Sequence, residues 1–335
     1  MTIWKILKII LSIFVVILIL IFTGQAVFNK TYQFPKKIIY GVTFSPQYAK
    51  YLELDWKQIF IKSLDELGVK EFRIPTYWNE IEKNVGEFSF EEVDFMVSEA
   101  GKRRARIILV VGFRQPRWPE CYLPKWATNL SLEEKRARIL NFVQKTTERY
   151  KDQRAVWAFQ VENEPFLPFF GENCDRGDVN FLKQEVNLVR SLSNKPIIIS
   201  DSGELGSWIS PMQLGDIFGT TLYRDVYNPI MGYFSYPFLP YLYNIKSQII
   251  RGIFAQKSEK TIIVELQAEP WLLGAGSKNP TQQAAVFPLS RLKNNLNYAQ
   301  KTGFDTSYLW GVEWWYFMDK NGYPQYLEYA KTLFD

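Results

Sequence analysis

The chain has 335 residues, of which 47% are hydrophobic and 16% aromatic, so it can bury a large core. Its 40 basic and 35 acidic residues are spread along the whole length, a pattern that excludes a nucleic-acid footprint, so nucleic acid is not an expected partner. Histidine is absent, which excludes Ser-His-Asp triads and HExxH zinc sites. The sequence also lacks a Walker loop, GxGxxG and an EF-hand loop, so we expect no cofactor and no metal.

An uncharged, apolar stretch lies near the N-terminus. It covers residues 9–28, and its length matches the roughly 20 residues that a membrane-spanning helix needs. We therefore expect residues 1–30 to form a transmembrane signal anchor and residues 31–335 to form one domain outside the cytoplasm. The alternative is a signal peptide that is cleaved near Ala26, which would release the domain.

After this segment, β-branched runs alternate with amphipathic stretches of helical period. Such alternation predicts a parallel sheet with crossover helices. The predicted strands cover residues 38–44, 71–75, 106–113, 155–162, 196–201, 217–223, 261–265 and 307–312. The clearest predicted helices cover residues 55–67, 90–104, 132–150, 180–192 and 282–301. Eight strands with intervening helices in a chain of this length predict an α/β fold, a (β/α)8 TIM barrel.

Charged and aromatic residues recur where the predicted strands end. In a barrel these positions meet at one rim, from which catalytic groups project. Apolar sugar faces stack on aromatic rings while sugar hydroxyls need polar partners, so this composition is typical of a sugar site. The candidates, in chain order, are Arg73, Trp78, Gln115, Asn163, Glu164, Tyr223, Glu265 and Trp310.

Glu164 and Glu265 are the candidate catalytic pair. Glu265 directly follows three β-branched residues, where a charge is costly unless the strand end opens into a polar cleft. Glu164 follows a strand that we expect to be buried, and the alternative for it is a structural ion pair with Arg73. Retaining hydrolysis of a glycoside requires two such carboxyl groups about 5 to 5.5 Å apart.

Two other glutamates compete with this pair. We expect Glu162 to form hydrogen bonds inside the barrel and Glu269 to line the cleft, and we prefer Glu265 to Glu269 as the nucleophile. Side chains alternate along a strand, so Asn163 and Glu164 can both reach the site only if the strand ends or bulges there. We therefore predict a backbone distortion at this place.

The triplet Asn163-Glu164-Pro165 after the fourth strand, with Glu265 after the seventh, resembles clan A of the glycoside hydrolases. The resemblance extends over most of the chain from about Ile38. Within the clan, the string that ends at Glu164 is similar to β-galactosidase families thirty-five and forty-two, while Arg73-Ile74-Pro75 looks equally like cellulase family five. The resemblance implies a (β/α)8 barrel and retaining hydrolysis of a β-linked oligosaccharide or polysaccharide.

By this resemblance Glu164 is the acid/base and Glu265 is the nucleophile, which Arg73 supports and Tyr223 approaches. It also implies that Asn163 binds the sugar 2-hydroxyl and that Trp310 forms the floor of the first subsite. Many clan members place histidines near the sugar after strands three and six, and this chain has none. Gln115 or Arg114 is the expected substitute, and Trp78 is a further candidate sugar contact.

Two cysteines, Cys121 and Cys174, are compatible by spacing with one disulfide or with two thiols. The barrel brings their loops to the same rim, which favours the disulfide. We expect a monomer at the cell membrane, held there by a single N-terminal span, with its catalytic domain outside the cytoplasm. Transglycosylation by the same fold and a non-catalytic carbohydrate-binding barrel remain as alternative functions.

Overall fold

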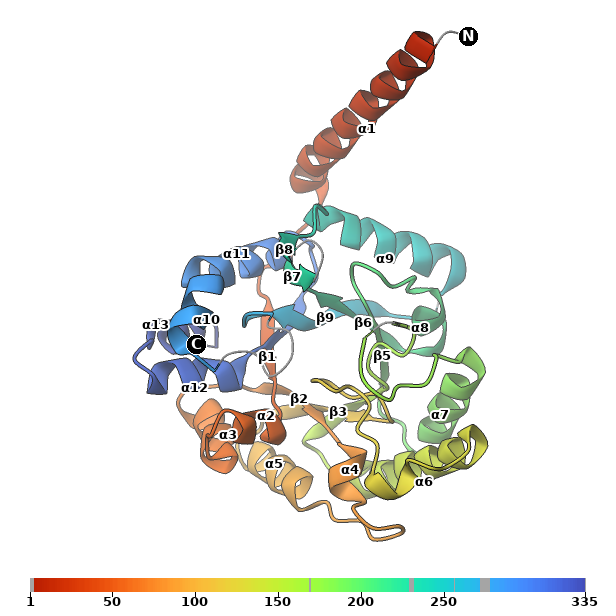
Figure 1. The fold of residues 1–335 in the computed structure, drawn as a ribbon, viewed down its shortest axis with the longest axis vertical. Coiled ribbons are helices and arrows are strands. Elements are labelled where there is room, and N and C mark those ends of the chain that lie inside the picture. Colours follow the sequence, from red (N-terminus) through yellow and green to blue (C-terminus); the bar gives the residue numbers. More distant parts are fainter. Residues whose placement is uncertain (1–2, 169, 229–231, 256, 272–277, 335) are drawn as a thin grey trace.

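Eight parallel strands form a closed barrel at the centre of the molecule (Figure 1). The computed structural model describes residues 3–168, 170–228, 232–255, 257–271 and 278–334. The strand order around the barrel is β1-β10-β9-β6-β5-β4-β3-β2, and β10 pairs with β1 to close it. The strands are β1 (Ile39–Thr43), β2 (Glu71–Pro75), β3 (Arg106–Val111), β4 (Val156–Val161), β5 (Ile197–Asp201), β6 (Ile217–Leu222), β9 (Lys260–Gln267) and β10 (Thr306–Trp310). The predicted (β/α)8 barrel and all eight of its strands are confirmed.

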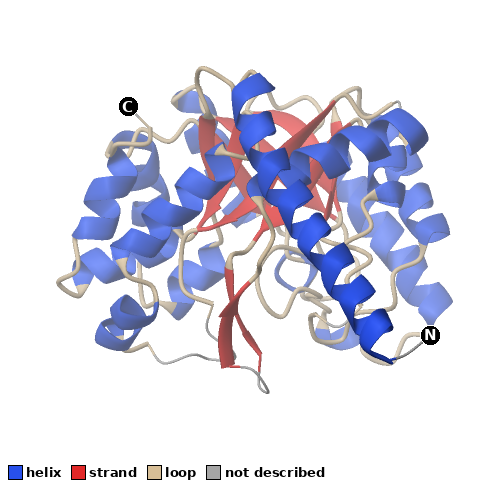
Figure 2. Ribbon diagram, turned by 90° about the horizontal axis from the view of Figure 1, so that it is seen from above, coloured by secondary structure: helices blue, strands red, loops and turns tan. Residues whose placement is uncertain are grey.

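Helices surround the barrel on its outer side (Figures 1 and 2). They are α2 (Pro46–Tyr51), α3 (Trp56–Asp65), α4 (Trp78–Ile81), α5 (Glu91–Lys102), α6 (Leu132–Tyr150), α7 (Val179–Leu192), α8 (Ile209–Leu214), α9 (Pro240–Phe254), α10 (Pro280–Val286), α11 (Leu289–Gln300), α12 (Val312–Lys320) and α13 (Gln325–Lys331), with a short 3-10 turn at Lys125–Ala127. The long helix α6 begins where its sequence predicts, because Ser131 and Glu134 form a reciprocal capping box.

The strands are apolar because both of their faces are covered. Inside the barrel, Ile108, Ala158, Ile198, Ile262 and Val264 form one fully buried cluster. The outward side chains of the same strands pack against the helices in a second, larger cluster. Strands that are buried on both faces lose the alternation of polar and apolar residues, so they read as continuous β-branched runs in the sequence.

Two features differ from the predicted elements. The predicted helix over residues 282–301 is split into α10 and α11, because Pro288 lies between them and a proline within a helix removes a hydrogen bond and clashes with the preceding turn. The antiparallel hairpin β7 (Asp225–Asn228) and β8 (Gly232–Ser235), which follows β6 directly, was not among the predicted elements. Figure 2 shows this hairpin projecting from the barrel.

Helix α1 (Ile3–Thr31) extends away from the barrel and touches it only near its C-terminal end (Figure 1). There the rings of Phe28 and Tyr241 lie 5.8 Å apart, and the Tyr32 hydroxyl donates to the Gly303 carbonyl at 3.1 Å. Within the described ranges, none of the helices combines the length and the apolar character that crossing a membrane demands. The structure therefore gives no support to the predicted transmembrane segment.

Candidate active site

Arg73 organises the mouth of the barrel. Its fully buried guanidinium lies at the C-terminal end of β2 and donates from Nη1 to Glu265 Oε1 at 2.7 Å. The other nitrogens donate to Gln160 Oε1 at 2.7 Å and to Asn163 Oδ1 at 2.6 Å. A buried ion pair is tolerated only when such additional hydrogen bonds satisfy it. The predicted contact between Arg73 and Glu265 is thus present, and one side chain links β2, β4 and β9.

Glu265 lies near the C-terminal end of β9, where the strand is irregular. The register of β9 shifts against both neighbours, between Ile263 and Glu265 on the β6 side and between Ile263 and Leu266 on the β10 side. Such a bulge re-aims a side chain. Besides its bond with Arg73, Glu265 accepts through Oε2 from the Tyr223 hydroxyl at 2.9 Å. Its carboxylate is therefore held by two donors from two different strand ends.

Glu164 stands in a distorted segment just after β4. The strand ends at Val161, and both Glu162 and Glu164 have left-handed backbone angles, with φ of 60° and 43°. The predicted distortion is therefore confirmed. Each such residue costs on the order of 1–3 kcal/mol, and the cost is offset here because the Glu162 carboxylate accepts from the backbone amides of Phe113 and Arg114. Glu164 itself accepts from the Thr221 hydroxyl at 3.0 Å.

The two carboxyl groups of the pair lie in different electrostatic environments. Burial raises the pKa of Glu164 well above its usual value, and the negative charges of Glu265, Glu120 and Asp201 raise it further. Among the described residues, no cation pairs with Glu164, whereas Arg73 pairs with Glu265. Burial and the charges of both glutamates also raise the pKa of Tyr223, which keeps its hydroxyl protonated as a donor. The arrangement favours a proton on Glu164 and none on Glu265.

A third glutamate, Glu120, belongs to the site and was missed by the sequence reasoning. It is buried in the loop after β3, and its Oε2 accepts from Asn163 Nδ2 at 3.0 Å. Burial, together with the charge of Glu265, raises the pKa of Glu120 to about 8. The next residue, Cys121, forms a disulfide with Cys174, with an S–S distance of 2.01 Å. The loop has no periodic pattern, so only its nearness to a cysteine marked it.

A second cluster of charges lies around Arg117 in the same loop. The Arg117 guanidinium carbon lies 3.7 Å from the ring centroid of Tyr48 and 4.2 Å from that of Trp310. Arg117 also pairs with Glu269, and with Glu313 at 3.1 Å. Trp310, predicted to be the floor of the first subsite, therefore presents one ring face to a guanidinium. Glu269 is buried in this cluster, and its carboxylate is paired rather than open to a cleft.

Trp78 does not lie at the site. Its ring is fully buried under the rim, its Nε1 donates to Glu82 Oε2 at 2.7 Å, and it packs against Phe113 and Phe142. The prediction of a sugar contact at Trp78 is therefore wrong. The reason is physical: Trp78 opens α4 beside the outer core, and position after a strand does not fix the direction of a side chain.

Gln115 and Arg114 are also occupied by structural bonds. Gln115 is fully buried, accepts from the Thr76 amide at 3.0 Å and donates to the Gly112 carbonyl at 2.9 Å. Arg114 donates to the carbonyls of Leu167 and Phe170. The side chains expected to replace the missing histidines thus hold loops together, and the prediction that they contact the sugar is corrected.

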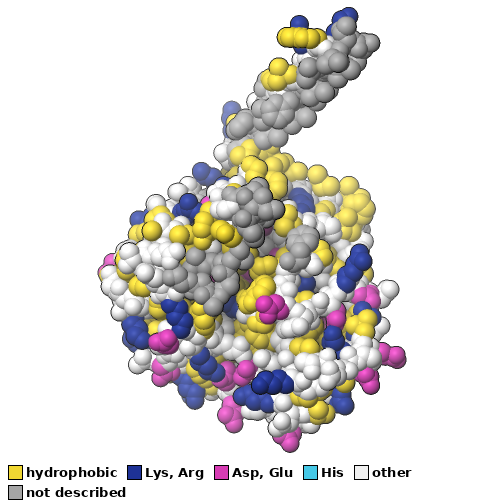
Figure 3. All heavy atoms as spheres, viewed as in Figure 1, with side chains coloured by type: hydrophobic (Ala, Val, Ile, Leu, Met, Phe, Trp, Pro, Cys, Tyr) yellow, Lys and Arg dark blue, Asp and Glu magenta, His cyan; other side chains and the backbone are white. Residues whose placement is uncertain are grey.

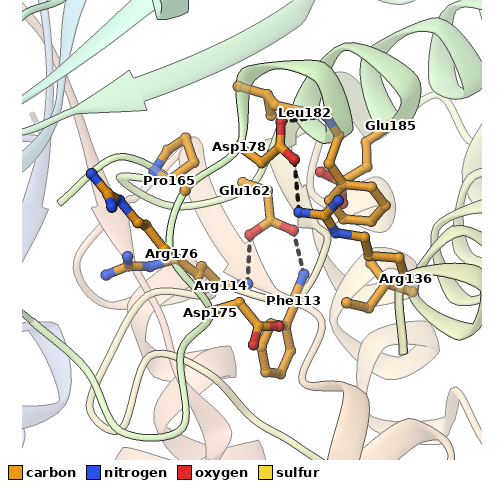
Figure 4. Close-up of a pocket in the computed structure, with 13 residues that line it drawn as sticks. Phe113, Arg114, Arg136, Glu162, Pro165, Asp175, Arg176, Asp178, Leu182 and Glu185 are labelled. Atoms are coloured by element: carbon orange, nitrogen blue, oxygen red, sulfur yellow. Dashed lines mark hydrogen bonds and ion pairs between the residues drawn. The ribbon is translucent and has the colours of Figure 1, made fainter. Parts of the chain in front are cut away.

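A small cavity of about 50 Å³ lies beside β4, between the barrel and helices α6 and α7 (Figure 4). Glu162 and Glu185 line it, so Glu162 lies outside the barrel and not inside it as predicted. Burial and the charge of Glu162 raise the pKa of Glu185 well above its usual value. Glu164 and Glu265 do not line this cavity, which holds space for a few water molecules at most. Across the described positions, no cluster of residues suited to a metal ion occurs.

The comparisons with known proteins agree with this architecture. The cellulase family model (glycosyl hydrolase family 5) matches residues 38–229, which is more than half of the chain. No curated protein sequence matches. Similar solved structures include the exo-β-1,4-mannosidase Op5Man5 from Opitutaceae bacterium strain TAV5, with 14% identity and a TM-score of 0.57, covering 88% of this chain and 59% of the mannosidase.

Two further structures share the fold. GH5_18 from Bifidobacterium longum subsp. longum has 13% identity and a TM-score of 0.55, and the match covers 82% of this chain and 70% of that protein. A β-galactosidase from the haloarchaeon Halorubrum lacusprofundi has 14% identity and a TM-score of 0.54, with 82% and 52% covered. At such identities the likeness shows the barrel fold alone.

Proposed function

The chain belongs to glycosyl hydrolase family 5, in clan A, and from this premise we propose that it cleaves β-glycosidic bonds of an oligosaccharide or polysaccharide with retention of configuration. The observation that carries the proposal is the asymmetry between Glu265 and Glu164. Glu265 has a cation and a hydroxyl as donors, whereas burial and neighbouring charges raise the pKa of Glu164. Retaining hydrolysis needs one ionised and one protonated carboxyl group at the same bond.

In the first step, a Glu265 oxygen attacks the anomeric carbon and the bond to the leaving oxygen breaks. Glu164 transfers its proton to that oxygen, so the leaving sugar departs as an alcohol. The result is a glycosyl ester on Glu265, and Glu164 is now ionised. When Glu265 loses its charge in the ester, one of the causes of the raised pKa of Glu164 disappears. Glu164 is then a better base for the second step.

In the second step, Glu164 takes a proton from a water molecule, whose oxygen attacks the anomeric carbon and displaces Glu265. The second displacement restores the original configuration and the original protonation of both glutamates. Arg73 and Tyr223 stabilise the carboxylate as it leaves, because they already donate to both of its oxygens. Asn163, which is held between Arg73 and Glu120, is placed to bind the sugar 2-hydroxyl.

The substrate class is proposed from the family and not from the details of the first subsite. The mannosidase and the β-galactosidase named above act on β-mannosides and β-galactosides by their titles, and an alanine variant of GH5_18 from Bifidobacterium longum is described in complex with Manβ1-4GlcNAc. Aryl β-mannosides, β-galactosides and β-glucosides therefore form the first panel to screen. Product analysis on the best of them separates hydrolysis from transfer of the sugar to another sugar.

The retaining mechanism is tested by the first product and by trapping. Proton NMR during early turnover should show the β-anomer, and a 2-fluoro-sugar inactivator should label the peptide that contains Glu265. An inverted first product, or a label on Glu269, would contradict the proposal. Binding of sugars without any labelling or turnover would favour the non-catalytic barrel instead.

The disulfide bears on where the protein works. The bond between Cys121 and Cys174 closes a loop at the rim of the site, and such bonds persist in oxidising compartments. We propose that the barrel lies outside the cytoplasm, held at the cell membrane through its N-terminal segment. Protease treatment of intact cells should remove the barrel; survival of the barrel under conditions that digest other surface proteins would contradict this location.

A further inference from the structure

Helix α9 carries an exposed apolar stripe. Ile245, Ile249 and Ile253 are spaced four residues apart and are 38%, 52% and 65% exposed, and Phe254 is 49% exposed. Hydrophobic side chains along one face of a helix normally pack against a core. In the part of the chain that the structure describes, these four remain on the surface, and Figure 3 shows apolar side chains gathered over this helix. The helix contains no acidic residue.

The stripe lies on the same side of the barrel as the base of α1 (Figure 1). Asn244, one residue before the stripe, donates from Nδ2 to the Tyr32 hydroxyl at 3.2 Å, and Tyr241 packs on Phe28. Helix α1 therefore leaves the barrel at the N-terminal end of α9. Residues 9–28 of α1 are uncharged, so the two helices place apolar sequence on one side of the molecule.

The junction between α1 and the barrel is basic. A cavity of about 540 Å³ opens there, lined by apolar residues that include Phe34 and Ile38 and by Lys36 and Lys301. Lys30 and Lys37, close by in the sequence, are exposed as well. A cavity with apolar walls and ammonium groups suits a molecule that has an acyl part and an anionic headgroup.

We propose that the membrane-facing side, defined here as Ile245, Ile249, Ile253 and Phe254 of α9 with the basic junction cavity, rests on a lipid surface that contains anionic lipids. An amphipathic helix at such a surface inserts its apolar face about 5–10 Å, and nearby lysines are attracted to anionic headgroups. A second copy of the chain is the competing occupant. Lipid is favoured because the stripe continues into the uncharged stretch of α1 and is flanked by lysines.

The proposal also orients the active site. Figure 1 looks along the barrel, and α1 leaves it roughly at a right angle to that view. With the α9 side on a bilayer, the mouth of the barrel opens along the membrane surface. A polysaccharide lying next to the membrane could then enter without approaching from the bilayer itself. The lipid contact does not depend on the proposed enzymatic activity.

The test places a fluorophore on the stripe of the full chain. The variant I249C has a single free thiol, because Cys121 and Cys174 are bonded to each other and the chain has no other cysteine. The matched control V85C replaces a residue that is 51% exposed and lies between α4 and α5, away from α1 (Figure 1). Both are labelled with an environment-sensitive dye and reconstituted in vesicles of phosphatidylcholine, alone or mixed with phosphatidylglycerol, with and without doxyl-labelled lipid.

We expect the dye at position 249 to shift to shorter wavelength and to lose emission with doxyl lipid, and the dye at position 85 to do neither. Phosphatidylglycerol should strengthen the effect, and K36E with K37E should remove that dependence. Emission at position 249 that ignores the doxyl lipid would overturn the proposal. A shift that grows with protein concentration in detergent, without lipid, would instead assign the stripe to a second copy. I253C gives an independent reading at the most exposed position.

Discussion

Two arginines at the barrel mouth each lie among glutamates, but they treat their carboxylates differently. Arg73 pairs with Glu265 alone and uses its other nitrogens on neutral amides, which leaves Glu164 without a cation. Arg117 pairs with Glu269 and with a second glutamate in the same cluster. The first arrangement separates two carboxyl groups in protonation, and the second joins two carboxylates to one positive charge.

The difference shows that two buried acids near an arginine do not by themselves make a catalytic pair. An acid and a nucleophile must differ in protonation at the same pH, and this requires unequal partners. Around Arg117 the partners are more equal, and burial still raises the pKa of Glu313 to about 7. We therefore interpret the Arg117 cluster as a structural wall beside Trp310. The following experiments break or sharpen this contrast, from the largest expected effect to the smallest.

Replacing the nucleophile should have the largest effect. E265Q keeps the shape of the side chain but removes the attacking charge, and we expect kcat to fall on the order of 10⁵-fold. E269Q is the matched control from the other cluster and should retain activity within about tenfold. Both are measured on an aryl β-glycoside, with circular dichroism to verify folding. Equal losses in the two variants would remove the distinction between the clusters.

E164Q should reduce turnover by roughly 10²- to 10⁴-fold, because it removes the proton donor and the later base. The loss should be smallest for substrates with acidic leaving groups, which need little protonation. Azide needs no general base, so it should restore turnover of such a substrate and yield a β-glycosyl azide. Failure of azide with every activated substrate would argue that Glu164 does not act in the second step.

R117M tests the structural wall through stability. It leaves Glu269 and Glu313 buried without their cation, and breaking a buried ion pair in this way costs about 3–5 kcal/mol of unfolding free energy. Adding E269Q and E313Q to the same chain should recover part of the loss. Urea unfolding of the three proteins measures it. An unchanged midpoint for R117M alone would show that the wall adds nothing to stability.

E120Q should have the smallest effect, and it should depend on pH. The folded pKa of Glu120 is raised from 4.5 to about 8, so the native state keeps a proton that the unfolded state has lost between these values. Stability from this group therefore falls as pH rises from about 4.5 to about 8. E120Q should melt at the same temperature as the wild type below pH 4.5 and at a higher one at pH 8. A constant difference across this range would show that Glu120 does not titrate there.

The fold was predictable from sequence because its signal is local. Each strand is a short apolar run bounded by polar residues, and each long helix has its own amphipathic pattern. The hairpin β7–β8 was missed since its strands have four residues each, too few for a clear period. The break between α10 and α11 lay in plain view at Pro288, and the longer helix was predicted across it only because the apolar spacing continues on both sides.

The site was predictable only where residues stand on the barrel strands or immediately after them. Arg73, Tyr223 and Glu265 meet because parallel strands bring their C-terminal ends to one rim. Glu120 and Arg117 come from a loop, and their positions depend on long-range contacts that no periodicity encodes. Trp78 shows the opposite failure, since its place after a strand suggested the cleft while its ring packs in the core.

The pairing of β10 with β1 makes the first barrel strand wait for the last one. During synthesis β1 emerges early and finds β2, yet its other side stays an open edge with unpaired amide and carbonyl groups until Thr306–Trp310 has left the ribosome. The nascent chain must therefore protect two edges for most of its translation. Truncation before β10 would leave a curved sheet prone to pairing with its neighbours rather than a smaller enzyme.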